Sequence, residues 1–171
     1  VLPNVLPALV AAFALFPLIP AWPYPRQGPI EVPSYFTSSA IEAVPAGSVA
    51  LVYPIADGVD TRAQLWQAMA GLRFRMPGGY FLVPQNGRPE TSTRTFTSDV
   101  LAGVLGGQPP SRTPALRRQL RAELAGWGVR SILAYPTGND PIGFFTWLTG
   151  RPPSEHIGGI YAWYGLTFSG A

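Results

Sequence analysis

Acidic side chains that could act as catalytic acids or bases follow two apolar stretches of the sequence. Asp57 and Asp60 come shortly after VALVYP, and Asp140 follows SILAYP. Two carboxylates that face each other across a cleft are the machinery of glycoside hydrolysis. Two of these acids also have an ordinary structural role open to them, because Asp60 can cap the helix that follows and Asp140 precedes Pro141 in a turn. The residue types alone leave both roles open.

Other catalytic groups are scarce. His156 is the single histidine and lies in PPSEHIGG, and the chain has no Gly-x-Ser-x-Gly motif. The absence of Cys excludes disulfides, thiolate metal sites and cysteine nucleophiles. One His with scattered carboxylates does not give metal-ligand spacing, so we expect no metal ion and no cofactor. The catalytic residues, if there are any, stay unknown at this level.

Aromatic, amide and guanidinium side chains are concentrated in LWQAMAGLRFRMPGGY, residues 65–80. Aromatic faces stack on sugar rings, amide and guanidinium donors bind sugar hydroxyls, and Arg can hold a lipid phosphate through two parallel hydrogen bonds. The segment therefore predicts a sugar or lipid-phosphate site. The alternative is that its large aromatic residues are core and its Arg side chains are surface. The residues predicted to bind ligand are Trp66, Gln67, Arg73, Arg75 and Tyr80, with Asp57 and Asp140 from the predicted strand ends.

The elements that must position these residues alternate between strands and helices. Apolar runs closed by Pro predict strands at 49–53 and 129–135, with further strands at 80–83 and 159–166. Helices are predicted at 38–44, from Asp60 or Thr61 to Leu72, and at 97–105, 111–126 and 141–148; residues 85–94 are predicted to be a polar loop. This alternation predicts an α/β fold, a small mixed sheet flanked by helices.

The position of the acids depends on how two of these strands run. If strands 49–53 and 129–135 are parallel, residues 53–60 and 135–140 lie at one edge of the sheet. Ligands of open α/β sheets bind beyond the carboxyl ends of the strands. The sequence therefore predicts that the two loops meet.

An uncharged stretch opens the chain, since the first charged residue is Arg26. Residues 1–22 reach the roughly 20 residues that a transmembrane helix needs, and Trp22 and Tyr24 suit an aromatic belt. The alternative is a buried core helix. A signal peptide would show Met and a basic stretch before its apolar run, and this sequence shows neither. We expect a transmembrane helix over 1–22, the last span of a larger protein, then a Pro-rich linker over 23–34 and a soluble α/β domain over 35–171.

The composition agrees with a chain that is not solvated by water alone. Hydrophobic residues make up 47% and charged residues 12%, against about 25% charged in typical soluble domains. The formal net charge is +3, and every basic residue is Arg. This excess is too small to indicate nucleic acid as a partner.

The segments WQA…FRMPGGY and WGVRSILAYP carry a further signal, because they follow an apolar span and a Pro-rich linker. In this order they resemble the C-terminal tail of large actinobacterial multi-spanning membrane proteins. Those proteins are glycosyltransferase-like, of the GT-C type that uses polyprenyl-phosphate sugars. The resemblance covers roughly residues 1–166 and implies an extracytoplasmic domain. The catalytic acid of GT-C enzymes lies in an early loop between membrane helices, so no catalytic residue is carried over to this chain.

Three functions follow from these observations. The first is a non-catalytic extracytoplasmic domain of a membrane glycosyltransferase-like protein of cell-envelope assembly, which contacts its own upstream membrane helices and a sugar or polyprenyl-phosphate ligand. The second is a soluble hydrolase that uses Asp57, Asp60 or Asp140. The third is a structural tail that packs on its own membrane domain. This hypothesis predicts a large exposed apolar patch on the isolated domain.

Overall fold

The computed structural model describes residues 30–57, 60–80, 82–85, 88–91 and 94–168. The chain divides into two units, Val1–Glu31 and Val32–Ala171, and the helices and strands that follow belong to the second. The transmembrane helix predicted over 1–22 lies outside the described residues, as does most of the predicted linker. Among the residues that are described, no helix is both long and apolar enough to cross a membrane.

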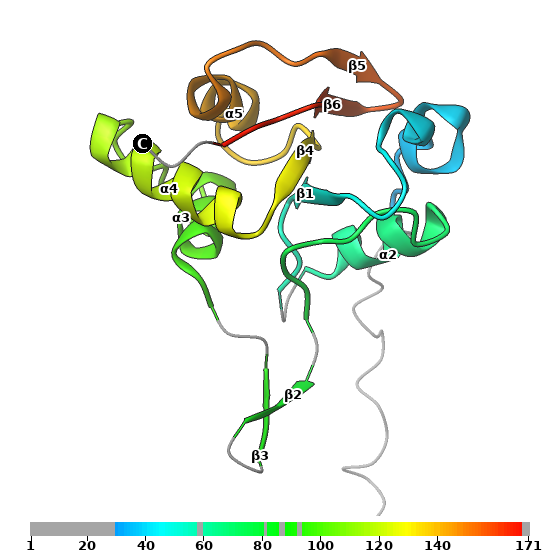
Figure 1. Ribbon diagram of the computed structural model, residues 1–171, viewed down its shortest axis with the longest axis horizontal. Helices are drawn as coiled ribbons and strands as arrows, with labels where there is room; N and C mark the ends of the chain where they lie inside the picture. Colours follow the sequence, from blue (N-terminus) through cyan, green and yellow to red (C-terminus); the bar gives the residue numbers. More distant parts are fainter. Residues whose placement is uncertain (1–29, 58–59, 81, 86–87, 92–93, 169–171) are drawn as a thin grey trace, which may run out of the picture. The chain divides into compact units, whose positions relative to one another are not determined.

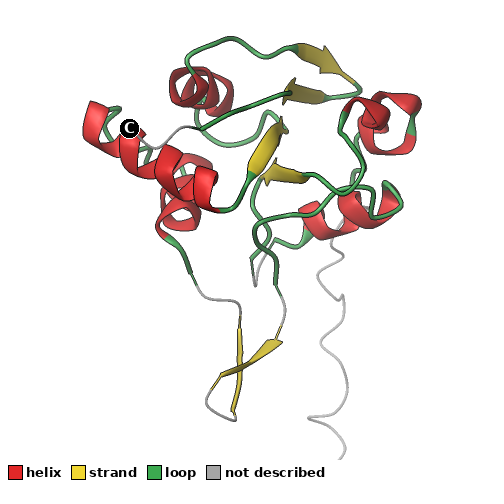
Figure 2. Ribbon diagram, viewed as in Figure 1, coloured by secondary structure: helices red, strands yellow, loops and turns green. Residues whose placement is uncertain are grey.

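Helices and strands alternate through the described part of the chain (Figure 2). In chain order the elements are η2 (Ser34–Thr37), η3 (Ser39–Ala43), β1 (Val49–Tyr53), α2 (Arg62–Met69), β2 (Leu82–Gln85), β3 (Arg88–Thr91), α3 (Phe96–Leu105), α4 (Pro114–Gly126), β4 (Val129–Ala134), α5 (Pro141–Thr149), β5 (Glu155–Ile157) and β6 (Ile160–Trp163). The two η elements are short 3₁₀ helices.

A mixed sheet forms the centre of this unit, with strand order β1-β4-β6-β5. Strands β1 and β4 run parallel, and Tyr53 lies opposite Ala134 at their carboxyl ends. Strand β6 is antiparallel to both of its neighbours, β4 and β5. The predicted α/β class with a small mixed sheet flanked by helices is therefore confirmed.

Helices cover both faces of the sheet (Figure 1). Because successive side chains of a strand point to opposite faces, Leu51 and Tyr53 of β1 pack with α3, α4 and α5. Ala50 and Val52 of the same strand pack with η2, η3 and α2 on the other face. Strands buried on both faces read as unbroken apolar runs, which is why VALVY and SILA are so easily found in the sequence.

Several predicted boundaries differ from the structure. Strand β1 has the predicted limits, whereas the second predicted strand is β2, which pairs in a separate hairpin with β3 instead of joining the sheet. Strand β3 lies within the segment predicted to be a polar loop, and β5 lies in the Pro/Gly-rich segment that surrounds His156. The helix predicted over 38–44 is the 3₁₀ helix η3, and η2 begins at Ser34, the last residue of the predicted linker.

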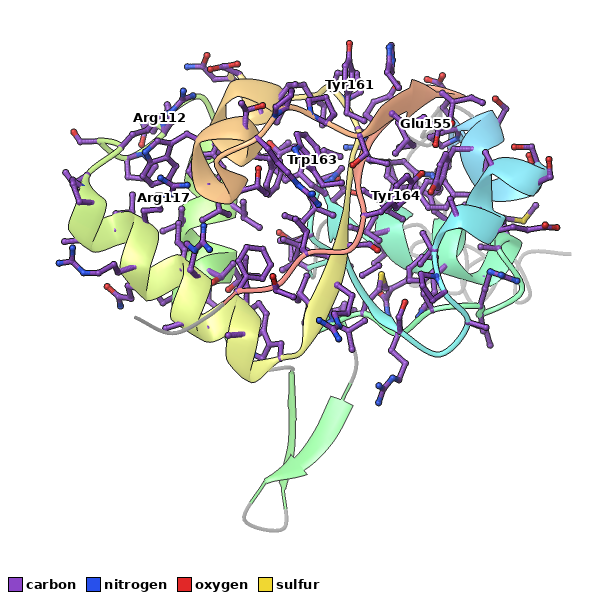
Figure 3. The ribbon with its side chains drawn as sticks, turned by 45° about the horizontal axis from the view of Figure 1, so that its top comes forward. Arg112, Arg117, Glu155, Tyr161, Trp163 and Tyr164 are labelled. Carbon is purple, nitrogen blue, oxygen red and sulfur yellow. The ribbon has the colours of Figure 1, made fainter. Side chains whose placement is uncertain are left out.

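Side chains of α4 hold the ends of its neighbours. Arg117 Nε and Arg121 Nη1 donate to the carbonyl oxygen of Leu148 at 3.2 Å and 3.4 Å, at the carboxyl end of α5. Glu123 Oε2 accepts from the main-chain nitrogen and from Oγ1 of Thr97 at 2.8 Å and 2.6 Å, at the amino end of α3. The two Arg side chains therefore lie at the negative end of the α5 dipole, and the Glu123 carboxylate lies at the positive end of the α3 dipole. Arg117 is labelled in Figure 3.

Candidate functional site

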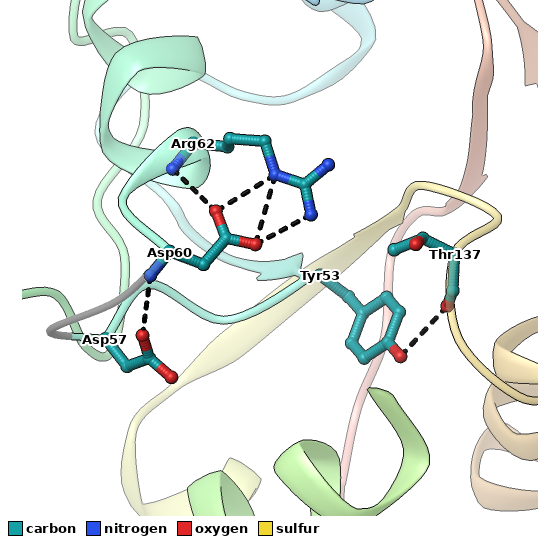
Figure 4. A network of polar contacts seen from close by, with 5 residues as sticks. All are labelled: Tyr53, Asp57, Asp60, Arg62 and Thr137. Carbon is teal, nitrogen blue, oxygen red and sulfur yellow. Dashed lines mark hydrogen bonds and ion pairs between the residues drawn. The ribbon is translucent and has the colours of Figure 1, made fainter. Parts of the chain in front are cut away.

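The two loops predicted to meet at the carboxyl edge of β1 and β4 do lie together (Figure 4). The main-chain nitrogen of Tyr135 donates to the Tyr53 carbonyl oxygen at 2.9 Å. The Tyr53 hydroxyl donates to the carbonyl oxygen of Thr137 at 3.1 Å. The predicted parallel arrangement therefore brings Tyr53, after which the loop that carries Asp57 begins, beside the loop that carries Asp140.

Asp57 and Asp60 stabilise the turn that leads into α2. The main-chain nitrogen of Asp60 donates to Asp57 Oδ1 at 2.7 Å. Asp60 is held by Arg62, whose Nε and Nη2 lie 2.9 Å and 2.7 Å from its two carboxylate oxygens. This hydrogen bond lowers the pKa of Asp60, so the carboxylate stays ionised at neutral pH.

Asp140 caps α5 from an uncommon backbone conformation. Its φ is 50°, in the left-handed region that Asp and Asn visit more readily than other side chains. The main-chain nitrogen of Gly143 donates to Asp140 Oδ1 at 3.0 Å, and Arg112 Nη2 lies 2.6 Å from Oδ2. The hydrogen bond from Arg112 lowers the pKa of Asp140. The structural role that the sequence left open for this residue is the one that the geometry shows.

Two of the acids at this edge of the sheet, Asp60 and Asp140, are poorly suited to general acid catalysis. A general acid in glycoside hydrolysis needs a carboxyl group with a raised pKa, whereas ion pairs lower the pKa of Asp60 and Asp140. Burial raises the pKa of Tyr53 to about 12, so its hydroxyl is neutral and serves as a hydrogen-bond donor. These groups are therefore better suited to holding the two loops than to transferring protons.

Trp66, the central residue of the predicted ligand cluster, belongs to the core. Its side chain is 1% exposed and its ring stacks on Phe36, with 5.3 Å between centroids and 19° between planes. The ring of Tyr135 lies 5.6 Å away on a tilt. Phe74 is equally buried, and Gln67 Nε2 donates to its carbonyl oxygen at 2.8 Å. In this conformation the Trp66 ring is not open to a sugar.

Arg73 and Arg75 lie at the amino end of β1 and bind main-chain carbonyls. Arg73 Nε donates to Val44 O and Arg75 Nε to Gly47 O, each at 3.0 Å. Residue 75 also bridges to Val49, the first residue of β1. These contacts tie the segment after α2 to the loop before β1.

The predicted ligand-binding residues therefore do not form one group. Arg73 and Arg75 lie at the amino end of β1, whereas Asp57 and Asp140 lie at its carboxyl edge. A strand of this length separates the two ends by roughly 13 Å, at about 3.3 Å per residue. Tyr80 is 43% exposed and exchanges main-chain hydrogen bonds with the Gln64 side chain, beside α2.

A polar chain at the other side of the sheet was not found by sequence reasoning. The hydroxyls of Tyr35 and Tyr164 lie 2.9 Å apart, and Tyr164 donates to Glu155 Oε2 at 3.0 Å (Figure 3). Burial raises the pKa of both tyrosines, so both hydroxyls are protonated at neutral pH. These hydrogen bonds link η2 to β5. Tyr35 and Tyr164 are 129 positions apart, so no local sequence pattern could predict their contact.

Two further polar residues lie near this chain in the fold. His156 is exposed and stacks on the Tyr161 ring, with 3.8 Å between the ring centroids. Ser131 lies in β4 opposite Ala50, and its buried Oγ has no hydrogen-bond partner among the described residues. Among the described residues, no hydrogen bond joins either side chain to a group that would make it a nucleophile or a base.

No three His, Asp or Glu side chains gather around a common point in the part of the chain that the structure describes. Comparison with models of protein families, with curated proteins and with solved structures finds no match to this chain.

Proposed function

We propose that this chain is a non-catalytic, extracytoplasmic C-terminal domain of a membrane glycosyltransferase-like protein of cell-envelope assembly. Residues 1–22 would be its membrane span, and its partners would be the upstream membrane helices of the same protein. The resemblance of WQA…FRMPGGY and WGVRSILAYP to the tails of GT-C-type proteins supports this placement. The long uncharged start of the chain supports it independently.

One observation carries the non-catalytic part of the proposal. The two carboxylates best placed for hydrolysis, Asp60 and Asp140, are each paired with an Arg and have lowered pKa values. Their oxygens also accept main-chain hydrogen bonds from Arg62 and Gly143 at the starts of α2 and α5. Acids in such positions stabilise a fold, and a glycosidase needs one of its two acids protonated.

A hydrolase assay tests this part of the proposal. The full chain, Asp60→Asn and Asp140→Asn would be incubated with a panel of aryl glycosides, and release of the aryl alcohol would be followed. We expect no release above buffer from any of the three proteins. Turnover by the unchanged chain that either substitution abolishes, with circular dichroism unchanged, would establish the hydrolase alternative.

Contact with a lipid-phosphate ligand is the second part of the proposal, and Arg75 is the residue best placed to make it. The Arg75 side chain is exposed and uses Nε for Gly47 O, which leaves its terminal nitrogens at the surface. Titration of the full chain with a polyprenyl phosphate should raise the melting temperature, and less so for Arg75→Gln. An unchanged melting temperature together with unchanged Trp fluorescence would remove the ligand from the proposal.

A further inference from the structure

Helix α2 and the turn after it carry exposed as well as buried apolar side chains. Ala63, Trp66 and Ala70 face the core of the domain. On the outer side Met69 is 50% exposed, and Leu72 in the turn after the helix is 67% exposed. A surface helix normally carries polar residues on its outer side, so Met69 and Leu72 form an exposed apolar spot at the carboxyl end of α2.

Leu72 is also held in a backbone conformation that disfavours its side chain. Its φ is 55°, directly after Gly71 at 64°, so two successive residues are left-handed. Only Gly adopts this region without steric cost. The turn is fixed by the Leu72 main-chain nitrogen, which donates to Gln67 O at 3.0 Å. Strained residues persist where the surrounding structure imposes them, often at functional positions; here the strain presents an apolar side chain to the outside.

Cationic side chains follow directly on this apolar turn. Arg73 and Arg75 donate to main-chain carbonyls, and neither belongs to the Arg–Asp ion pairs found among the described residues. Arg73 Nη2 also reaches the main-chain carbonyl of Glu42 at 3.3 Å, so one nearby acidic residue reduces the positive charge. Exposed apolar side chains are therefore followed by guanidinium groups that no carboxylate of the described residues meets at ion-pair distance.

We infer that the outer side of α2 and the turn after it, with Met69, Leu72 and Arg75 as its main contacts, dock on the phosphate headgroup layer of a lipid bilayer. Met69 and Leu72 enter the boundary between headgroups and acyl chains, and Arg75 binds lipid phosphate. Apolar residues beside cations are the composition of interfacial membrane segments. The inference rests on the proposed function, because that function holds the domain near a membrane.

A bilayer fits this surface better than a protein does. Stable protein interfaces use about 20–30 residues on each side, and the exposed apolar side chains here are confined to one turn and the helix before it. An anionic bilayer needs no matching partner surface of fixed size, and its negative surface potential attracts each nearby Arg side chain. A second copy of the chain, or another part of the same protein, remains an outcome that the test below distinguishes.

A single-site fluorescent label tests the inference in the full chain. The chain has no Cys, so Leu72→Cys gives one attachment point for an environment-sensitive dye. Gln119→Cys, at an exposed position of α4, is the matched control. Each labelled protein would be mixed with vesicles of phosphatidylcholine and phosphatidylglycerol, with and without brominated acyl chains. We expect the dye at position 72 to brighten and to be quenched by brominated lipid, and the dye at 119 to do neither.

The charge contribution has its own control. Arg75→Gln in the Leu72→Cys background should weaken the lipid-dependent signal roughly fivefold, the factor that about 1 kcal/mol per surface cation gives. Arg118→Gln, at an exposed position of α4, should leave it unchanged. Equal effects of the two substitutions would contradict a specific role for Arg75.

Every outcome at position 72 decides the inference. A dye that stays open to aqueous iodide in the presence of vesicles overturns it. A dye that is shielded from iodide but not quenched by brominated lipid shows that protein covers this surface, and that also overturns it. Retention of the protein in carbonate-washed membranes is measured on the same samples, so the proposed membrane placement can stand while the docking surface fails, or the reverse.

Discussion

Asp140 shows how much of this domain is decided by single side chains. Its carboxylate caps α5 and pairs with Arg112, and its backbone has a left-handed conformation in the loop before α5. Asp60 stabilises the turn before α2, because its carboxylate accepts hydrogen bonds from the main-chain nitrogen and the side chain of Arg62. The sequence identified both residues as unusual but could not separate a catalytic from a capping role, because the deciding partner of Asp140 is 28 positions away.

These two acids predict how stability depends on pH. Their folded pKa values are lower than the unfolded value of 3.8, so the unfolded chain binds protons more tightly. The stability they contribute is therefore present above about pH 4 and is lost as the pH falls through their folded pKa values. Urea unfolding should show a fall in the free energy of unfolding on acidification. Because both pairs are partly exposed, we expect the Asp60→Asn, Asp140→Asn double variant to reduce that fall by only about 1 kcal/mol.

The outcome that would contradict this prediction is a double variant with the same acid dependence as the unchanged chain. Arg112→Gln is the matched control for one of the two pairs, since it removes the largest cause of the lowered Asp140 pKa but leaves the carboxylate and its hydrogen bond from Gly143. It should flatten the acid dependence in the same direction and by a smaller amount.

Gly138 gives a second prediction at this scale. Its φ is 84°, and a Cβ there would lie 2.8 Å from Leu105 Cα, the Tyr53 hydroxyl and Val104 O. Gly138→Ala should therefore lower the free energy of unfolding by about 2 kcal/mol. At Gly126 a Cβ would meet nothing within 4 Å. Gly126→Ala should therefore leave the free energy of unfolding unchanged or raise it by at most about 1 kcal/mol. Similar effects of the two substitutions in urea unfolding would show that the loop after β4 is not packed as described.

At the scale of elements, the sequence predicts best where the chain is buried on both faces. Strand β1 and helix α5 have predicted limits within one residue of the structure, because apolar runs, Pro and Gly mark their ends. In α2 the buried Ala63 and Trp66 face the core, whereas Met69 is exposed. Hydrophobic periodicity predicts the helix but does not distinguish a buried apolar residue from an exposed one.

The elements that sequence reasoning missed are those formed by pairing. Strand β5 has three residues and exists because it pairs with β6. Strands β2 and β3 place Pro84 opposite Pro89, two residues that argue against a strand when read alone. The Asn86-Gly87 dipeptide between them is typical of two-residue hairpin turns. That dipeptide was the available signal for a hairpin.

The Tyr35–Tyr164–Glu155 chain predicts an energetic link between η2 and β5. Tyr164→Phe removes a hydrogen bond to a carboxylate and leaves Tyr35 without its acceptor, so we expect a loss of about 2 kcal/mol. Tyr35→Phe should cost about 1 kcal/mol. The double variant should cost little more than Tyr164→Phe alone, because the two share one interaction. Additive losses in thermal or urea unfolding would mean that the hydroxyls do not act as one chain.

For the whole molecule, the sheet separates the residues that the sequence analysis predicted to form one ligand-binding group. The predicted ligand-binding residues are divided between the two ends of β1, and the ring of Trp66 belongs to the core between sheet and α2. Side chains as close in sequence as Asp57 and Arg73 can therefore lie at opposite ends of one strand. What remains at the surface near α2 is an exposed apolar turn with Arg73 and Arg75 beside it.

The central claim is that this domain works at a membrane as part of a larger envelope protein. The most direct measurement is the partition of the intact chain after expression, with the membranes washed in alkaline carbonate. The account predicts that the chain stays in the membrane pellet and is released only by detergent. A chain that is recovered folded and monomeric in the carbonate supernatant would contradict it, and the acids at the carboxyl edge of β1 and β4 would then be the first residues to test for catalysis.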